Sequence, residues 1–246
     1  MRILAIDTST LHGSVGWIVA REAASFSEIE VLDWALMSAP AVPGHSETLL
    51  SRIDNMLTAG RFKTEDVDLF VYGRGPGTFT GLRIGLATMK GLALASGKPI
   101  VGISSLESLA FSSPVSGTVA CLIDARRKEL FAGIYKVTRV GGWAEAKCIV
   151  PEWVAPAGEV IGHLSATKED EPVFLVGNGI GPYRELIREK CSPESCVILP
   201  EQYWAPSAVS MATAGLKLFL ERGPDSLKDA VPVYLREPDA RLPVPQ

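Results

Sequence analysis

The chain has 246 residues, of which 47% are hydrophobic and 21% charged, and its net charge is -4. This composition is typical of a globular protein, and a chain with excess acid lacks the basic surface with which proteins grip nucleic acid unaided. No run approaches the roughly 20 apolar residues of a membrane-spanning helix. The cysteines Cys121, Cys148, Cys191 and Cys196 form no Cys-x-x-Cys pair, and the first residues resemble a strand more than an export signal. We therefore expect reduced thiols and a cytoplasmic protein of bacterial type.

The first half of the chain predicts a hairpin, a third strand, and then helices alternating with strands. Ser46 is the predicted N-cap of the first helix, and Gly60 is its predicted end. Loops are expected at residues 40–44 and 168–171, and Ser104 or Ser105 is the predicted N-cap of a short helix that ends at Ala110. The predicted strands cover residues 3–6, 14–20, 30–37, 67–72 and 99–103, and the predicted helices cover 46–59, 80–96 and 105–110.

A glycine-rich segment lies between the strand at 67–72 and the helix at 80–96. Gly73, Gly75 and Gly77 can adopt positive φ, so this loop could hold an anion at the start of the helix. The lysine of a phosphate-binding P-loop and the third glycine of a dinucleotide fingerprint are both missing. A sharp corner with close helix packing is the alternative, and residue chemistry favours it. The helix itself is apolar around nearly its whole circumference, so we expect it to be covered on all sides.

The second half of the chain repeats the pattern of the first. Asp7 precedes Gly16 by nine residues, and Asp124 precedes Gly133 by nine. Predicted strands follow at 119–124, 130–137, 144–150, 173–176 and 197–199, and predicted helices at 157–164, 182–190 and 206–221. A duplicated unit and an α/β protein of two lobes are therefore expected. We assign residues 1–104 with about 206–236 to the N-terminal lobe, 105–205 to the C-terminal lobe, and 237–246 to a disordered tail.

The residues that could carry chemistry are few. The three histidines include no pair at i, i+4, which argues against a histidine-bound metal, and no Gly-x-Ser-x-Gly elbow is present. Asp7 with the hydroxyls that follow it could coordinate hydrated Mg²⁺ and phosphate, but a polar turn that satisfies its own backbone explains the same residues. A kinase or ATPase that acts on a small molecule is thus the alternative function.

Charged residues at two further positions raise the question of a partner. Arg126, Arg127 and Lys128 form a basic cluster beside Asp124, and such a cluster is more often a solvated corner than a binding site. Arg83 lies one turn into the apolar helix, where an unpaired buried charge would be costly, so we expect it to have a specific partner.

The helices predicted at 46–59 and 80–96 offer more apolar surface than one sheet face needs. A surplus of this kind favours a subunit contact, although a thick monomeric core would also explain it.

Several motifs together resemble the TsaB (YeaZ) family. They are Ile6-Asp7-Thr8-Ser9, His45-Ser46-Glu47, the run from Gly75 to Gly85, Asp124-Ala125-Arg126-Arg127-Lys128-Glu129 and Tyr234-Leu235-Arg236. The resemblance covers nearly the whole chain. It implies a two-lobed actin-like (ASKHA) fold, in which each lobe is an RNase H-like mixed sheet with flanking helices.

The resemblance also implies a function. TsaB proteins are non-catalytic partners of TsaD. TsaC makes threonylcarbamoyl-adenylate, and TsaD together with TsaE transfers the threonylcarbamoyl group to tRNA. The acceptor is the adenosine next to the anticodon of tRNAs that read codons beginning with A. The implied partners are TsaD in a heterodimer, TsaE, and a second copy when the chain is alone, with tRNA bound only through the complex and no membrane. The metal-binding histidine pair of TsaD matches Ser105 and Leu109 here, so we expect neither catalytic residues nor a metal site.

The resemblance points to two sets of site residues. The implied partner interface, built from the first two helices, comprises Leu49, Leu50, Ile53, Leu57, Gly75, Thr78, Phe79, Leu82, Arg83, Leu86 and Met89. The implied nucleotide positions are Asp7, Thr8, Ser9, Gly177, Asn178 and Gly179. In other superfamily members two adjacent glycines and then a small residue stand at this place. Here Gly179 is followed by Ile180, which departs from that pattern. We expect no cofactor of the chain's own, and weak or partner-dependent binding of ATP or ADP with Mg²⁺ in the complex.

Overall fold

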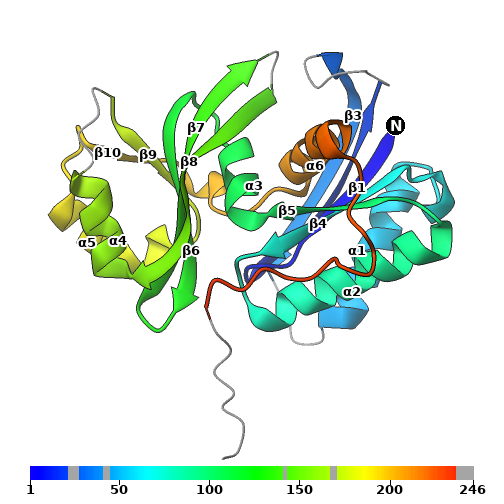
Figure 1. Cartoon of the computed structure of the whole chain (residues 1–246), viewed down its shortest axis with the longest axis horizontal. Coiled ribbons are helices and arrows are strands. Elements are labelled where there is room, and N and C mark those ends of the chain that lie inside the picture. Colours follow the sequence, from blue (N-terminus) through cyan, green and yellow to red (C-terminus); the bar gives the residue numbers. More distant parts are fainter. Residues whose placement is uncertain (22–27, 41–44, 141–142, 167–170, 237–246) are drawn as a thin grey trace, which may run out of the picture.

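The computed structural model describes residues 1–21, 28–40, 45–140, 143–166 and 171–236. Two five-stranded mixed sheets form the centres of two lobes, and a short helix, α3 (Ser105–Phe111), lies between them (Figure 1). The first sheet has the strand order β3-β2-β1-β4-β5. Its strands are β1 (Arg2–Asp7), β2 (His12–Ala20), β3 (Val31–Pro40), β4 (Leu69–Gly75) and β5 (Ile100–Ser104).

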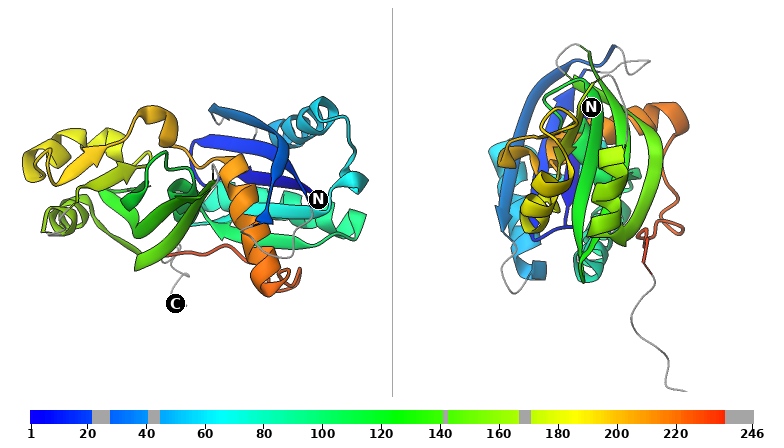
Figure 2. Two further views of the ribbon diagram at one scale, coloured as in Figure 1. Left: turned by 90° about the horizontal axis from the view of Figure 1, so that it is seen from above. Right: turned by 90° about the vertical axis from the view of Figure 1, so that its left-hand side faces the viewer.

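Two helices cover one face of the first sheet, and a third helix covers the opposite face. The helices α1 (His45–Ala59) and α2 (Phe79–Ser96) pack on one face, with the short 3-10 helix η2 (Thr64–Asp66) between them in the chain. Helix α6 (Ala208–Arg222) returns from the second lobe to the opposite face. Figure 2 shows α6 lying across this lobe when the molecule is seen from above. Alternate residues of β1 therefore enter two different cores, with Leu4 and Ile6 on the α1 and α2 side and Ile3 and Ala5 under α6.

The second sheet has the order β10-β9-β6-β7-β8. Helix α3 packs on the face toward the first lobe, and α4 (Ala157–Ala166) and α5 (Ile180–Lys190) cover the outer face (Figure 1). A 3-10 helix, η3 (Glu201–Tyr203), precedes the return to α6. The strands are β6 (Gly117–Arg126), β7 (Glu129–Val140), β8 (Trp143–Pro156), β9 (Val173–Val176) and β10 (Cys196–Ile198).

The two sheets share one topology. The order β3-β2-β1-β4-β5 becomes β8-β7-β6-β9-β10 when each strand is replaced by its counterpart in the second half. The glycines at the nine-residue spacing lie at matching places, since Gly16 pairs with Ala5 and Gly133 pairs with Cys121. The predicted duplication and two-lobed α/β fold are confirmed. The lobe boundaries predicted near residues 104 and 206 are not tested by the strand order and stay a prediction.

The structure corrects several local predictions. Helix α1 begins at His45, so Ser46 lies inside the helix. The helix ends at Ala59, so its predicted end at Gly60 is confirmed. The left-handed residue that follows is Arg61, with φ 58°, and a Cβ at Gly60 would lie 2.2 Å from the Phe62 ring. Helix α2 is not covered on all sides, since Leu94 is 74% exposed. The predicted loop at 40–44 is wrong at Pro40, which ends β3, and its residues 41–44 lie outside the described residues. So do residues 168–170 of the loop predicted at 168–171 and the predicted tail at 237–246.

No helix in the described part of the chain combines the length and apolar character needed to cross a membrane. The four cysteines are free thiols, and burial together with the neighbouring Cys196 raises the pKa of Cys191 to about 12.

Candidate functional site

Among the described residues, the most deeply buried acidic side chain lies at the end of β1. Asp7 is fully buried, and its Oδ1 accepts hydrogen bonds from the Ser9 backbone N–H (2.9 Å) and the Ser9 hydroxyl (2.6 Å). Its Oδ2 accepts a hydrogen bond from the Ser105 hydroxyl at 2.8 Å. Removal from water raises the pKa of the carboxyl, and these three hydrogen bonds partly oppose the rise. Asp7 thereby joins the first sheet to α3, the helix between the lobes.

Backbone and side chains approach Asp7 closely. A Cβ at Gly73 would lie 2.2 Å from Oδ2 of Asp7, so β4 touches the carboxylate directly. The cavity beside it, bordered by Thr8, Arg52 and Gly81, measures about 30 Å³. That volume admits about one or two water molecules.

The glycine-rich segment forms a packing corner. The Thr78 N–H, at the start of α2, donates to the Ser9 carbonyl at 2.7 Å, so the turn after β1 occupies the position where an anion would bind. A Cβ at Gly81 would lie 2.0 Å from the Thr8 carbonyl oxygen, and the Thr8 hydroxyl donates to the Gly81 carbonyl at 2.8 Å. Gly75 has φ 101° and is followed by a cis peptide bond to Pro76. Of the two interpretations of this segment, the structure supports the corner.

The second group of predicted nucleotide residues is also engaged in packing. Gly177 has φ 113°, and a Cβ there would lie 2.0 Å from the Leu122 carbonyl oxygen. The Gly179 N–H donates to that oxygen at 3.0 Å, and Oδ1 of Asn178 accepts from the Asp124 N–H at 3.1 Å. These contacts tie β9 to β6. Residues of both predicted nucleotide groups thus make contacts within the chain itself, and binding of ATP or ADP with Mg²⁺ in the complex stays a prediction.

The two positions that match the metal ligands of TsaD are both buried. Ser105 donates to Asp7, and Leu109 lies in the core between α3 and the second sheet. Within the described residues, no group of three or more histidine, cysteine, aspartate or glutamate side chains could hold a metal.

A second polar contact between the lobes was not predicted from the sequence. The Ser104 and Tyr135 hydroxyls both donate to Oε1 of Glu152, the latter at 2.8 Å, and so connect β5 with β7 and β8. Ser104 also caps α3, because its hydroxyl accepts from the Leu106 and Glu107 N–H groups. The cap has a local sequence signal and was predicted. The bond to Glu152 joins residues 48 positions apart and has no such signal.

The predicted partner interface divides into buried and exposed positions. Leu50 is 54% exposed and Phe79 is 42% exposed, Arg83 is exposed, and Thr78 is half-buried. For the remaining positions the prediction of a surface contact is wrong. Their side chains, or the backbone of Gly75, already pack within this subunit. Those positions are Leu49, Ile53, Leu57, Gly75, Leu82, Leu86 and Met89.

Arg83 has a partner, as expected, but it lies at the surface. Its guanidinium lies 3.6 Å from the centroid of the Phe79 ring, and its Nε donates to the Tyr234 hydroxyl at 3.0 Å. The Phe79 and Tyr234 rings are 5.1 Å apart. This cluster fastens the C-terminal segment, residues 225–236, to the start of α2.

Known proteins resemble this chain over nearly its full length. The family model described as "TsaD: tRNA N6-adenosine threonylcarbamoyltransferase" matches residues 40–243. The tRNA threonylcarbamoyladenosine biosynthesis protein TsaB of Haemophilus influenzae is 26% identical over 96% of this chain and 94% of its own length. The protein of the same name from Escherichia coli is 30% identical over 96% of this chain and 95% of its own length. The chain belongs to the TsaB family, a branch of the group that the TsaD model describes.

The solved structures agree with this assignment. YeaZ from Pseudomonas aeruginosa, at 25% identity, superposes with a TM-score of 0.75 and covers 95% of this chain and 100% of its own. The TsaB family resemblance inferred from the glycine run and the other motifs is therefore confirmed, and so is the actin-like fold.

The buried Asp7 predicts a specific dependence of stability on pH. Because the folded state holds the Asp7 proton more tightly than the unfolded state, stability is greatest below the unfolded pKa near 3.8 and falls as pH rises through the folded pKa. Asp7→Asn places a neutral group of the same shape there, so its unfolding free energy should lack this fall and equal or exceed that of the wild type at neutral pH. Urea unfolding between pH 4 and 8 measures the difference.

Asp7→Ala is the matched control, because it also removes the charge but leaves the Ser9 and Ser105 hydroxyls without their acceptor. It should be less stable than Asp7→Asn at every pH. If the unfolding free energy of the wild type exceeded that of Asp7→Asn, and did so by more as the pH rose, the raised pKa of the carboxyl would be contradicted.

Gly177 should be required for folding of the lobe. Gly177→Ala should lower the unfolding free energy by about 2 kcal/mol or more, since it combines positive φ with a clash against the Leu122 backbone. Gly162→Ala is the control, because Gly162 lies within α4 with open space at its Cβ and alanine should stabilise the helix by about 1 kcal/mol. Equal stabilities of the two variants by urea unfolding would show that the contact of Gly177 with β6 is misplaced.

Proposed function

We propose that this chain is a non-catalytic subunit that supports threonylcarbamoylation of the tRNA adenosine next to the anticodon, as a partner of a TsaD-type transferase and a TsaE-type ATPase. The observation that carries the proposal is the hydrogen bond between Ser105 and the enclosed Asp7 carboxylate. This hydrogen bond places protein groups at the centre of an actin-like fold. Ser105 stands where the resemblance to TsaD would require a metal ligand. The relatives named as tRNA threonylcarbamoyladenosine biosynthesis proteins supply the pathway.

The same geometry weighs against the alternative of a kinase or ATPase. Such an enzyme needs a carboxylate open to Mg²⁺ and phosphate, but Asp7 is fully buried and its oxygens accept three hydrogen bonds from the chain itself. The backbone N–H at the start of α2 is likewise used by Ser9.

The exposed part of α1 and α2 supports a partner contact. We define the α1–α2 face as the exposed residues Leu50, Phe79, Arg83, Ala87 and Leu94. The larger apolar side chains that remain on the described part of both helices pack into the first lobe, so this face is what the helices offer to another protein. We propose that it binds the TsaD-type partner, or a second copy when the chain is alone.

Reconstitution tests the function. The chain is combined with TsaD-type and TsaE-type proteins of the same organism, threonylcarbamoyl-adenylate and an unmodified tRNA transcript, and the modified nucleoside is quantified. Modification should depend on this chain. Equal modification when the chain is omitted would refute the proposal.

The α1–α2 face has its own prediction. Leu50→Glu combined with Phe79→Glu should abolish pull-down of the TsaD-type partner and reduce dimerisation in size-exclusion chromatography, because two charges would be buried in the contact. The fold should survive, since both side chains are substantially exposed.

The control replaces two apolar residues that are exposed elsewhere on the same lobe. Leu32 and Trp34 lie on the edge strand β3 and are 53% and 58% exposed. Leu32→Glu combined with Trp34→Glu should leave association intact. If the control loses the partner and the α1–α2 variant keeps it, the contact lies on β3 and the assignment is wrong.

A further inference from the structure

The turn between β6 and β7 has an unusual backbone. Arg126, Arg127 and Lys128 have φ angles of 62°, 53° and 64°, so three consecutive residues other than glycine occupy the left-handed region. Each costs about 1 kcal/mol or more there relative to ordinary backbone, and glycine or asparagine would be the less strained choice. All three side chains are exposed, so packing does not explain why they are basic.

The turn is braced by its neighbours. Oδ1 of Asp124 accepts from the Arg126 N–H at 2.9 Å, and the Lys128 carbonyl accepts from the Ala157 N–H at the start of α4, also at 2.9 Å. The Arg236 guanidinium donates to the Ala125 carbonyl at 2.9 Å. These contacts fix the backbone from both sides, so the cations project from a rigid support.

The basic residues continue on both sides of the turn. Toward α2, Arg236 follows Tyr234, whose hydroxyl accepts from Arg83. In the other direction, the Lys190 ammonium donates to the Gly158 carbonyl at 3.1 Å, next to the residue that binds Lys128. We name this contiguous set the basic stripe, and it comprises Arg83, Arg126, Arg127, Lys128, Lys190 and Arg236. In Figure 1 the C-terminal segment, in red, runs from α2 to the end of β6 along its course.

The stripe carries a local excess of positive charge in a chain whose net charge is -4. Two of its arginines are paired with acids, because Asp124 is 3.3 Å from Arg126 and Glu129 is 2.9 Å from Arg236. Within the described part of the chain, the Lys128 ammonium has no ion pair.

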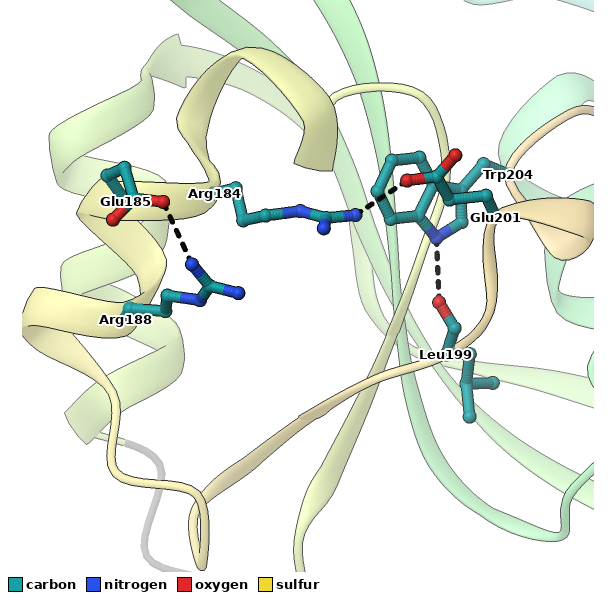
Figure 3. Close-up of polar contacts among 6 residues, drawn as sticks. All are labelled: Arg184, Glu185, Arg188, Leu199, Glu201 and Trp204. Carbon is teal, nitrogen blue, oxygen red and sulfur yellow. Dashed lines mark hydrogen bonds and ion pairs between the residues drawn. The ribbon is translucent and has the colours of Figure 1, made fainter.

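Elsewhere on this lobe, two arginines of α5 are matched with acids. Figure 3 shows Arg184 bonded to Glu201 at 2.8 Å and Arg188 bonded to Glu185 at 2.9 Å, while Trp204, beneath Arg184, donates to the Leu199 carbonyl. Lys128 in the stripe differs from these two arginines, because it has no acidic partner among the described residues.

We propose that the basic stripe binds the phosphate backbone of the tRNA in the assembled complex. This rests on the proposed function, which brings a tRNA to the complex. A row of exposed arginines and lysines along an extended path is how proteins contact successive phosphates, which position the nucleic acid without reading its sequence. The stripe begins at Arg83 on the α1–α2 face and continues across the second lobe, so an RNA bound by the partner can extend along it.

The test uses Arg127→Asn combined with Lys128→Asn, since asparagine tolerates left-handed backbone and removes both charges. Arg127→Gly combined with Lys128→Gly relieves the strain entirely and serves as a second variant if the first folds poorly. The control is Lys136→Gln combined with Lys147→Gln, which removes the same charge from exposed residues that pair across β7 and β8 in the same lobe. Each is assembled with the TsaD-type partner, and binding of an unmodified tRNA transcript is measured over a range of salt concentrations.

The turn variants should bind the tRNA at least about tenfold more weakly at 0.1 M salt, and the slope of log affinity against log salt should fall by about two, one for each lost phosphate contact. The control should keep the slope of the wild type, and thermal unfolding of the turn variants should occur at the wild-type temperature or above. An unchanged affinity and slope in the turn variants would overturn the proposal.

Loss of the TsaD-type partner by the turn variants, with normal tRNA affinity in the complexes that remain, would also overturn it, because the stripe would then bind protein. Neither outcome bears on the proposed function, which is tested by omitting the wild-type chain from reconstitution.

Discussion

The hydrogen bond between the carboxylate of Asp7 and the hydroxyl of Ser105 is the contact on which the rest of the structure depends. It joins the end of β1, at the middle of the first sheet, to the first residue of the helix between the lobes. Burial makes the ionised carboxylate unfavourable, so it persists only because Ser9 and Ser105 surround it with donors. The polar groups at the centre of the molecule therefore join the two lobes. Asp7, Ser9 and Ser105 occupy this place with the chain's own side chains.

The glycines around this centre follow from the same constraint. Gly73, Gly81 and Gly85 each lie where a Cβ would be within 2.2 Å of an oxygen of Asp7 or Thr8. A segment that would cradle phosphate in another protein instead brings strand and helix backbones close to the turn after β1. The same set of small residues can serve either purpose, and only the occupant of the helix N-terminus distinguishes them. Here that occupant is the Ser9 carbonyl.

Features with a local or periodic signal could be predicted from the sequence. The alternation of strands and helices, the cap at Ser104 and the repeat at Asp7 and Asp124 all depend on residues a few positions apart, and the structure has them. What could not be predicted depends on pairs distant in sequence. Glu152 meets Ser104 only because β8 lies beside α3, and Ile53 and Met89 are interior because α1 and α2 lie side by side on the sheet. An apolar stripe alone does not say whether its own sheet or another protein covers it.

Asp7 thus contributes to folding, while the groups proposed to contact partners lie at the surface. If Asp7 has no part in the chemistry of the complex, the most direct test is the rate of tRNA modification by a reconstituted complex that carries Asp7→Asn. The account predicts the wild-type rate. A loss on the order of a hundredfold, the size expected when a catalytic acid, base or metal ligand is removed, in a complex that still assembles, would contradict it.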